Sequence, residues 1–106
     1  MYRQGDVLAV PVTAADVPAD AVVAPVDRLG RFVLARGEAT GHAHVVAGPR
    51  LRVVADPGEP DRLFVEVVTY GRITHEEHGP IALPAGFYRV VRQREYIPGS
   101  YRPVAD

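Results

Sequence analysis

The sequence contains no cysteine, no lysine and a single serine, Ser100. Without cysteine the chain has no disulfide, no thiolate nucleophile and no cysteine-type zinc site. A phosphate-cradling P-loop is also excluded, because that motif requires a lysine. No Gly-x-Ser-x-Gly elbow surrounds Ser100, which argues against serine-type acyl transfer.

Long apolar runs and a strong net charge are missing as well. No stretch approaches the roughly 18–20 uninterrupted apolar residues of a membrane span. Residues 1–6 lack the apolar region and the small-residue cleavage site of a secretory signal. The formal net charge is −1, so no global field attracts nucleic acid or anionic lipid. We therefore expect a cytoplasmic protein that does not contact a membrane.

The pattern of the remaining residues is typical of β structure. Ten glycines and ten prolines separate short runs rich in valine, leucine and aromatic residues, and none of these runs has a sustained helical period. Within 63–68, apolar residues alternate between two faces. We predict an all-β fold, a small barrel or sandwich of about six to eight short strands. We expect it to form a single domain over 1–106, with an extended tail from about 98. Predicted strands are 7–12, 31–35, 42–47, 51–55, 63–68, 81–83 and 87–97, with shorter or weaker extended segments at 21–26 and 71–74. A helical turn is predicted near 14–17, a hairpin turn at 56–61 and a turn at 84–86.

All four histidines fall into two close pairs, His42 with His44 and His75 with His78. Side chains alternate along a strand, so His42 and His44 point the same way, with Cα atoms about 6.6 Å apart. At that spacing two imidazoles can reach one ion, with zinc–nitrogen bonds of about 2.0–2.1 Å. The second pair lies in a polar segment that Pro80 ends. A single turn there brings residues three apart onto one side.

Neutral imidazoles suit transition metals, whereas magnesium and calcium prefer oxygen ligands. We therefore predict one divalent transition-metal site, with zinc as the first choice and iron or nickel as alternatives. Its predicted ligands are His42, His44, His75 and His78. The segment differs from the His-Glu-x-x-His helix of zinc proteases, because its second histidine comes one residue too early.

Glu38, Glu76 and Glu77 lie near the histidines in sequence. A carboxylate there can bind the ion, orient a ring or act as a general base. In a metal-dependent enzyme, three histidines would hold the ion beside an open water position, and Glu76 or Glu77 would be the catalytic base. In a non-catalytic module, four histidines would close a structural site. A metal-free histidine cluster, structural or responsive to pH, is a third interpretation. The residues specify no reaction.

Four motifs resemble those of small uncharacterised proteins from bacteria and their prophages. They are Gln-Gly-Asp-Val at 4–7, Gly-Glu-x-Thr-Gly-His-x-His at 37–44, Thr-His-Glu-Glu-His at 74–78 and Arg-Glu-Tyr at 94–96. The resemblance covers nearly the whole chain. It implies that these positions matter for a shared role, and it brings no activity with it.

The chain resembles cupins more weakly. Cupins are small β-barrels that hold a metal on a His-x-His pair. Four residues separate Gly37 from His42 where the cupin pattern has five, and the glutamate expected soon after the second histidine is missing. The segment 84–86 resembles the cupin Pro-x-Gly turn, but Arg89 stands in place of that family's second-motif histidine. This resemblance implies a cupin-like metalloenzyme as an alternative.

Partners are suggested by two further features. Arg89, Arg92 and Arg94 lie close together, and strand spacing puts Arg92 and Arg94 on one face. Such a strip can bind anions and keeps nucleic acid open as a partner, although ion pairing with Glu95 is the simpler role. A homodimer is also predicted as an option, because a small barrel can cover valine-rich edges by association.

Overall fold

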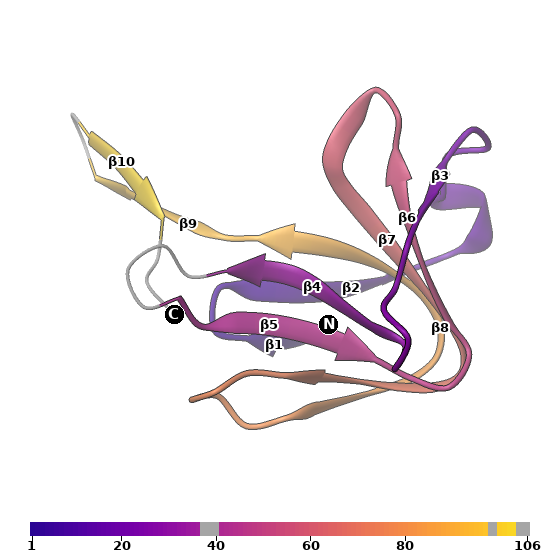
Figure 1. Cartoon of the computed structure of the whole chain (residues 1–106). Coiled ribbons are helices and arrows are strands. Elements are labelled where there is room, and N and C mark those ends of the chain that lie inside the picture. The colour runs from indigo at the N-terminus through magenta and orange to yellow at the C-terminus, as the bar shows by residue number, and fades with distance from the viewer. Residues whose placement is uncertain (37–40, 98–99, 104–106) are drawn as a thin grey trace.

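The computed structural model describes residues 1–36, 41–97 and 100–103. Eight strands of this described part form one antiparallel sheet that curls into a half-barrel, which confirms the predicted all-β fold (Figure 1). Among the described residues, the only helical element is the 3-10 turn η1 (Ala14–Asp16), close to the predicted helical turn. The described residues contain no helix with the length and apolar character needed to cross a membrane. The strands are β1 (Tyr2–Gln4), β2 (Val7–Val12), β3 (Val22–Ala24), β4 (Arg31–Arg36), β5 (Ala43–Ala47), β6 (Leu51–Asp56), β7 (Glu59–Thr74), β8 (Ile81–Arg92), β9 (Arg94–Ile97) and β10 (Ser100–Pro103).

The long strand β7 connects the two halves of the sheet. One of its edges pairs with β8, while the other pairs first with β6 and then, further along, with β5. The full order is β1-β2-β8-β7-β5-β4, with β6 on β7 and β3 on β6. The β6–β7 hairpin turns over Pro57 and Gly58, because Asp56 already pairs with Glu59. The predicted hairpin is therefore confirmed, with a tighter turn than 56–61.

The segment 84–86, predicted as a turn, instead continues strand β8. In this region Val67 pairs with Gly86 and Tyr70 pairs with Pro84, so two residues of β7 lie opposite one residue of β8. This is a β-bulge, and proline and glycine inside a strand are typical of one. The prediction was wrong because proline and glycine bend a paired strand here without ending it. For the same reason the predicted strands 63–68 and 71–74 are parts of one strand, β7.

The predicted strand 87–97 is interrupted after Arg92. At the break, the backbone N–H of Gln93 donates to the carbonyl oxygen of Asp6 over 2.7 Å. Strand β9 then leaves the main sheet and pairs with β10, so the tail after about 98 includes a strand. The expected common face of Arg92 and Arg94 depended on an unbroken strand, and the side chain of Arg94 lies outside the described residues.

A close crossing of two chain segments holds the bend of β7 in place. The connection between β5 and β6 passes over β7 at Gly48. A Cβ atom on Gly48 would lie 2.6 Å from the carbonyl oxygen of Tyr70 and 3.3 Å from the Cα atom of Gly71. Real Cβ atoms do not approach backbone that closely, so this crossing requires glycine.

The core lies on the inner face of the curled sheet. Val65 and Val67 are almost fully buried while Glu66 is half-buried and Val68 is exposed, so the predicted alternation holds over 65–68. It fails at Phe64, which belongs to the opposite face and is also buried. Burying one such aliphatic side chain stabilises the fold by roughly 1.5–3 kcal/mol. Ile73 ends the buried row and lies next to the histidine-bearing turn. The remaining core members are Val7, Ala9, Leu34, Ala35, Val46, Val53, Leu83 and Tyr88.

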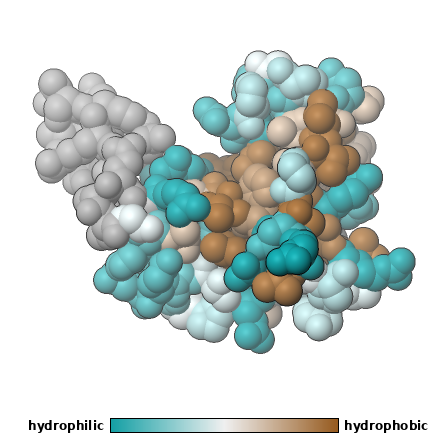
Figure 2. Space-filling model, viewed as in Figure 1, coloured by the Kyte–Doolittle hydropathy of each residue, from teal (hydrophilic) through white to brown (hydrophobic). Residues whose placement is uncertain are grey.

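The half-barrel is open along a groove between β4, the start of β7 and the end of β8. Figure 2 shows hydrophobic side chains gathered in the middle of this face, with hydrophilic ones around them. Two of the arginines from the predicted strip, Arg89 and Arg92, line the groove together with Arg62. Acidic residues, Glu59 and Asp61, line it too, so the groove is not uniformly basic.

Candidate functional site

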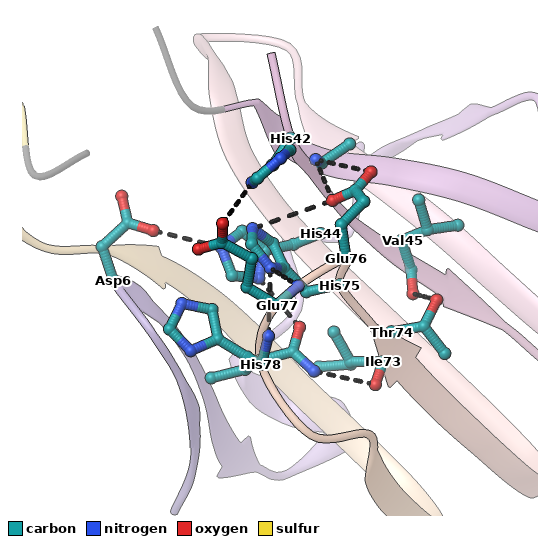
Figure 3. Close-up of polar contacts among 12 residues, drawn as sticks. Asp6, His42, His44, Val45, Ile73, Thr74, His75, Glu76, Glu77 and His78 are labelled. Atoms are coloured by element: carbon teal, nitrogen blue, oxygen red, sulfur yellow. Dashed lines mark hydrogen bonds and ion pairs between the residues drawn. The ribbon is translucent and has the colours of Figure 1, made fainter. Parts of the chain in front are cut away.

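The four histidines lie together at one end of the half-barrel (Figure 3). His44 is in β5 and His42 lies just before it, while His75 and His78 belong to the turn between β7 and β8. The ring centroid of His75 lies 5.4 Å from that of His42, 4.3 Å from that of His44 and 4.6 Å from that of His78. Those of His44 and His78 are 5.9 Å apart. His75 is thus in ring contact with all three others.

Strand register explains why segments some thirty residues apart meet here. In the antiparallel pair β5–β7, Val45 is opposite Thr74, and the hydroxyl of Thr74 donates to the carbonyl oxygen of Val45 over 3.5 Å. The next residues outward are His44 on one strand and His75 after the other. Their side chains meet because the paired strands place them side by side.

His75 organises the turn that carries it. Its Nδ1 atom accepts the backbone N–H of Glu77 over 3.0 Å and that of His78 over 3.3 Å. A neutral imidazole has one donor and one acceptor nitrogen, so Nε2 carries the ring proton in this arrangement. That atom is buried without a hydrogen-bond partner among the described residues, and it lies 3.9 Å from Oε2 of Glu76.

Glu76 fastens the turn to strand β5. Its carboxylate accepts the backbone N–H of Ala43, with Oε2 at 2.9 Å and Oε1 at 3.3 Å. This hydrogen bond is the main reason why the pKa of Glu76 is lowered, and the positive potential of His42 and His75 adds to it. The side chain is half exposed and ionised. Glu77 is more exposed, and its Oε1 lies 3.8 Å from Nδ1 of His42.

His44 is buried, with 1% of its surface exposed. Its Nδ1 is 2.8 Å from Oε1 of Gln4, and its Nε2 is 3.2 Å from Oδ1 of Asp6. Gln4 and Asp6 are themselves buried, at 3% and 5%. They flank Gly5, whose φ of 58° opens the two-residue turn between β1 and β2. A positive φ at the first central position is typical of a type II′ hairpin turn, which favours glycine there.

Burial keeps two of the rings neutral. It is the largest cause of the lowered pKa of His44, followed by the potential of His75, while Asp6 acts in the opposite direction. For His75 burial again lowers the pKa most, followed by the potential of His78. The neutral imidazole is the form that binds a metal.

Three donor groups are close enough to share an ion. Ligand atoms from His42, His75 and Glu76 lie within 4.8 Å of one another. Of the other predicted ligands, His44 and His78 surround this triad through ring contacts. Glu77 lies at its exposed rim, and Glu38 falls outside the described residues.

Sequence reasoning missed Gln4 and Asp6 as site residues. Both are polar residues just before the hydrophobic segment 7–12, and both belong to the Gln-Gly-Asp-Val motif. In the sequence this motif carries only a resemblance. Its link to the histidines could not be read from the sequence, because it depends on a contact between residues 40 positions apart.

Comparison with known proteins relates the chain to one protein family. No curated protein and no solved structure matched it. Residues 3–93 match a protein family described as a domain of unknown function (DUF8820). The match includes both histidine pairs and the Gln-Gly-Asp-Val stretch, and it agrees with the expected relationship to uncharacterised proteins. Because it spans most of the chain, the protein belongs to this family.

Proposed function

We propose that the protein binds one divalent transition-metal ion, zinc in the first place, in the histidine cluster. The observation that carries this proposal is the grouping of His42, His75 and Glu76, whose donor atoms lie within 4.8 Å of one another. Two imidazole nitrogens and a carboxylate oxygen form a ligand set that zinc, iron and nickel accept. The remaining imidazoles, His44 and His78, extend the set of neutral donors.

Donor spacing indicates how much the site must close. Two ligands about 2.1 Å from a tetrahedral ion are about 3.4 Å apart. The gap between His75 Nε2 and Glu76 Oε2 is 3.9 Å, and the widest gap in the triad reaches at most 4.8 Å. Small side-chain rotations bring these atoms into range, and Glu76 and the rim residues are exposed enough to move.

The turn at 75–78 has to change when the ion binds. Coordination through His75 Nε2 requires the ring proton to be on Nδ1, where it conflicts with the two backbone N–H groups that now donate to that atom. Metal binding is therefore coupled to a rearrangement of these two hydrogen bonds. The amide signals of Glu77 and His78 should report it directly.

An open coordination position would make the site catalytic. Glu76 is held by the N–H of Ala43, so Glu77 at the exposed rim is better placed to act as a base on a metal-bound water. A closed site with four protein ligands would be structural instead. The proposal that the protein binds a metal ion does not require the protein to be an enzyme.

One observation favours a metal-free structural cluster as a second candidate. His44 is held between Gln4 and Asp6, and a protonated ring would pair with the buried carboxylate of Asp6. Such a buried polar network stabilises a unique packing without any ion. The two candidates differ in whether the wild-type protein takes up metal.

The test is zinc, nickel and iron(II) binding to untagged protein, followed by calorimetric titration and thermal unfolding with and without a chelator. We expect one equivalent of ion, and a stabilisation of about 2.7 kcal/mol when free metal reaches 100 times Kd. His42→Ala should weaken binding, whereas the surface control Asp20→Asn should not. Absence of uptake, together with unchanged melting for all three metals, would contradict the proposal and favour the metal-free cluster.

A further inference from the structure

The side chain of Gln4 links the first hairpin to both segments that carry the histidines. It is buried, with 3% of its surface exposed. Its Nε2 atom donates to the carbonyl oxygen of Ile73 over 3.0 Å and to that of Gly79 over 2.9 Å. Its Oε1 atom lies 2.8 Å from Nδ1 of His44. One side chain therefore contacts the chain before the turn at 75–78, the chain after it, and a ring in β5.

These contacts determine the direction of each hydrogen bond. Carbonyl oxygens only accept, so the NH2 end of the Gln4 amide must face Ile73 and Gly79, and its oxygen must face His44. That oxygen also only accepts, so Nδ1 of His44 carries a proton and donates to it. Nδ1 cannot bind a metal ion for as long as this bond persists. Metal-ligating histidines are commonly oriented in this way, through a hydrogen bond from the second ring nitrogen to an oxygen.

The bonds to Ile73 and Gly79 close the end of the β7–β8 hairpin. Ile73 and Ile81 form the outermost backbone pair of that hairpin. Pro80 has no N–H group, so it cannot donate a ladder hydrogen bond beyond this pair. Gln4 supplies two donors instead, and it holds the carbonyl oxygens at both ends of the turn within hydrogen-bond distance of one nitrogen atom. A side chain from outside the hairpin therefore holds the two ends of the histidine turn together.

Gln4 is itself held in place by contacts that do not involve the histidines. In β1 it pairs with Val7 of β2, and β2 pairs in turn with β8. The backbone N–H of Gln93, just after β8, donates to the carbonyl oxygen of Asp6 over 2.7 Å. The backbone that carries the Gln4 amide is therefore fixed by the sheet, whatever the conformation of residues 75–78.

We infer that Gln4 is a positioning residue of the metal site: its amide fixes both ends of the turn at 75–78 and the ring of His44, so that the ion rearranges only the residues in between. This inference rests on the proposed function, in which coordination by His75 breaks the two hydrogen bonds inside the turn. Those two bonds lie within the segment that Gln4 holds at its ends. The three hydrogen bonds of Gln4 persist while the two inner ones change.

Gln4→Met tests the inference, because it keeps the length of the side chain and removes all three hydrogen bonds. Zinc titrations should show at least about a tenfold loss of affinity relative to the wild type. Gln93→Met is the matched control, since it makes the same substitution at an exposed glutamine and should leave the affinity unchanged.

Gly48→Ala is the control for stability. Its Cβ atom would lie 2.6 Å from the carbonyl oxygen of Tyr70, so we expect it to destabilise the fold at the end of β5 opposite to His44. It should bind zinc as tightly as the wild type. A loss of affinity that Gln4→Met shows and Gly48→Ala does not share cannot come from lower stability alone.

A second measurement uses the wild-type protein, so it does not depend on whether the variant folds. Both side-chain NH2 protons of Gln4 should exchange slowly with solvent, and zinc should leave that protection unchanged. Histidine side-chain 15N spectra should show Nδ1 of His44 protonated with and without zinc. The backbone amide signals of Glu77 and His78 should shift when zinc is added, since their hydrogen bonds are the ones expected to change.

The possible failures are distinguishable. If zinc binding removes the protection of the Gln4 NH2 protons or the proton on His44 Nδ1, the inference is overturned and the proposed function stays in place. The same holds if Gln4→Met binds zinc as tightly as the wild type, or if either control loses as much affinity as Gln4→Met. A wild type that takes up no zinc overturns both. Weakened binding in Gln4→Met, together with unchanged controls and preserved protection, supports both.

Discussion

The carboxylate of Glu76 accepts the backbone N–H of Ala43 over 2.9 Å, and so joins the β7–β8 turn to the residue between His42 and His44. The bond brings the two histidine pairs into a fixed relation, because one partner lies in each segment. Any change at Glu76 therefore affects both a proposed metal ligand and the positions of its neighbours.

Glu76→Ala should lower zinc affinity by at least about tenfold, since it removes a ligand and the tie to β5. Glu76→Gln keeps an acceptor for the Ala43 N–H, so it should be destabilised less than Glu76→Ala. It should still bind zinc less tightly than the wild type. Calorimetric titration of both variants separates the two roles. Equal affinity in wild type and Glu76→Ala would remove Glu76 from the ligand set.

Asp6→Ala should destabilise the metal-free protein by about 1–3 kcal/mol, because it removes a buried carboxylate that lies 3.2 Å from Nε2 of His44. The matched control Asp20→Ala removes an exposed carboxylate and should leave the stability unchanged. Urea unfolding at neutral pH in chelator measures both variants, and equal stability of the two would show that the contact between Asp6 and His44 does not stabilise the fold.

Acid should destabilise the metal-free protein. Burial lowers the pKa of His44 and His75 in the folded state below the ordinary histidine value near 6.5. Between the folded and unfolded pKa values the unfolded chain binds more protons, so stability is fully present above about pH 6.5 and falls as the pH drops below it. Thermal melts from pH 8 to pH 5 in chelator measure this. A melting temperature that stays level or rises below pH 6.5 would contradict the neutral state of these rings.

Zinc affinity should fall over the same pH range, because protons compete for the imidazole nitrogens.

Gly48→Ala should destabilise the fold by about 1–3 kcal/mol, as overpacking does, because its Cβ atom would lie 2.6 Å from the carbonyl oxygen of Tyr70. Gly79→Ala is the matched control, since a Cβ atom there would meet nothing within 4 Å. Comparison of the two by chemical denaturation tests the requirement for glycine at the crossing. Equal stability of both variants would show that the β5–β6 connection can shift away from β7.

Local patterns predicted the β fold and the grouping of the histidines more successfully than they predicted strand boundaries. Alternation in 63–68 correctly put Val65 and Val67 on one face, but it did not show that Phe64, on the other face, is buried as well. The segment 84–86 was misassigned because proline and glycine break an isolated strand more readily than one held between β2 and β7. Local signals do not report how many neighbours a strand has.

The candidate site was only partly predictable for a related reason. His-x-His and His-x-x-His are short-range patterns, so both pairs could be recognised from their spacing. Asp6 and Gln4 become site residues only through contacts with His44, and an isolated Gln-Gly-Asp stretch is also consistent with an ordinary hairpin turn. The tautomer of His44 could not be predicted from the sequence either. The proton is on Nδ1 because the amide group of Gln4 donates to two backbone carbonyl oxygens and therefore turns its own oxygen towards His44.

The groups around His44 come from the first hairpin, the fifth strand and the turn after the seventh, with β7 and β8 between them in the sheet. No fragment of the chain carries all of them, and such non-local strand pairs form late and slowly during folding. An ion with high affinity for this arrangement would therefore bind only to chains whose sheet is complete. In chains that are incompletely synthesised or cut by a protease, the same imidazoles would lie apart, and such an ion would stay in solution.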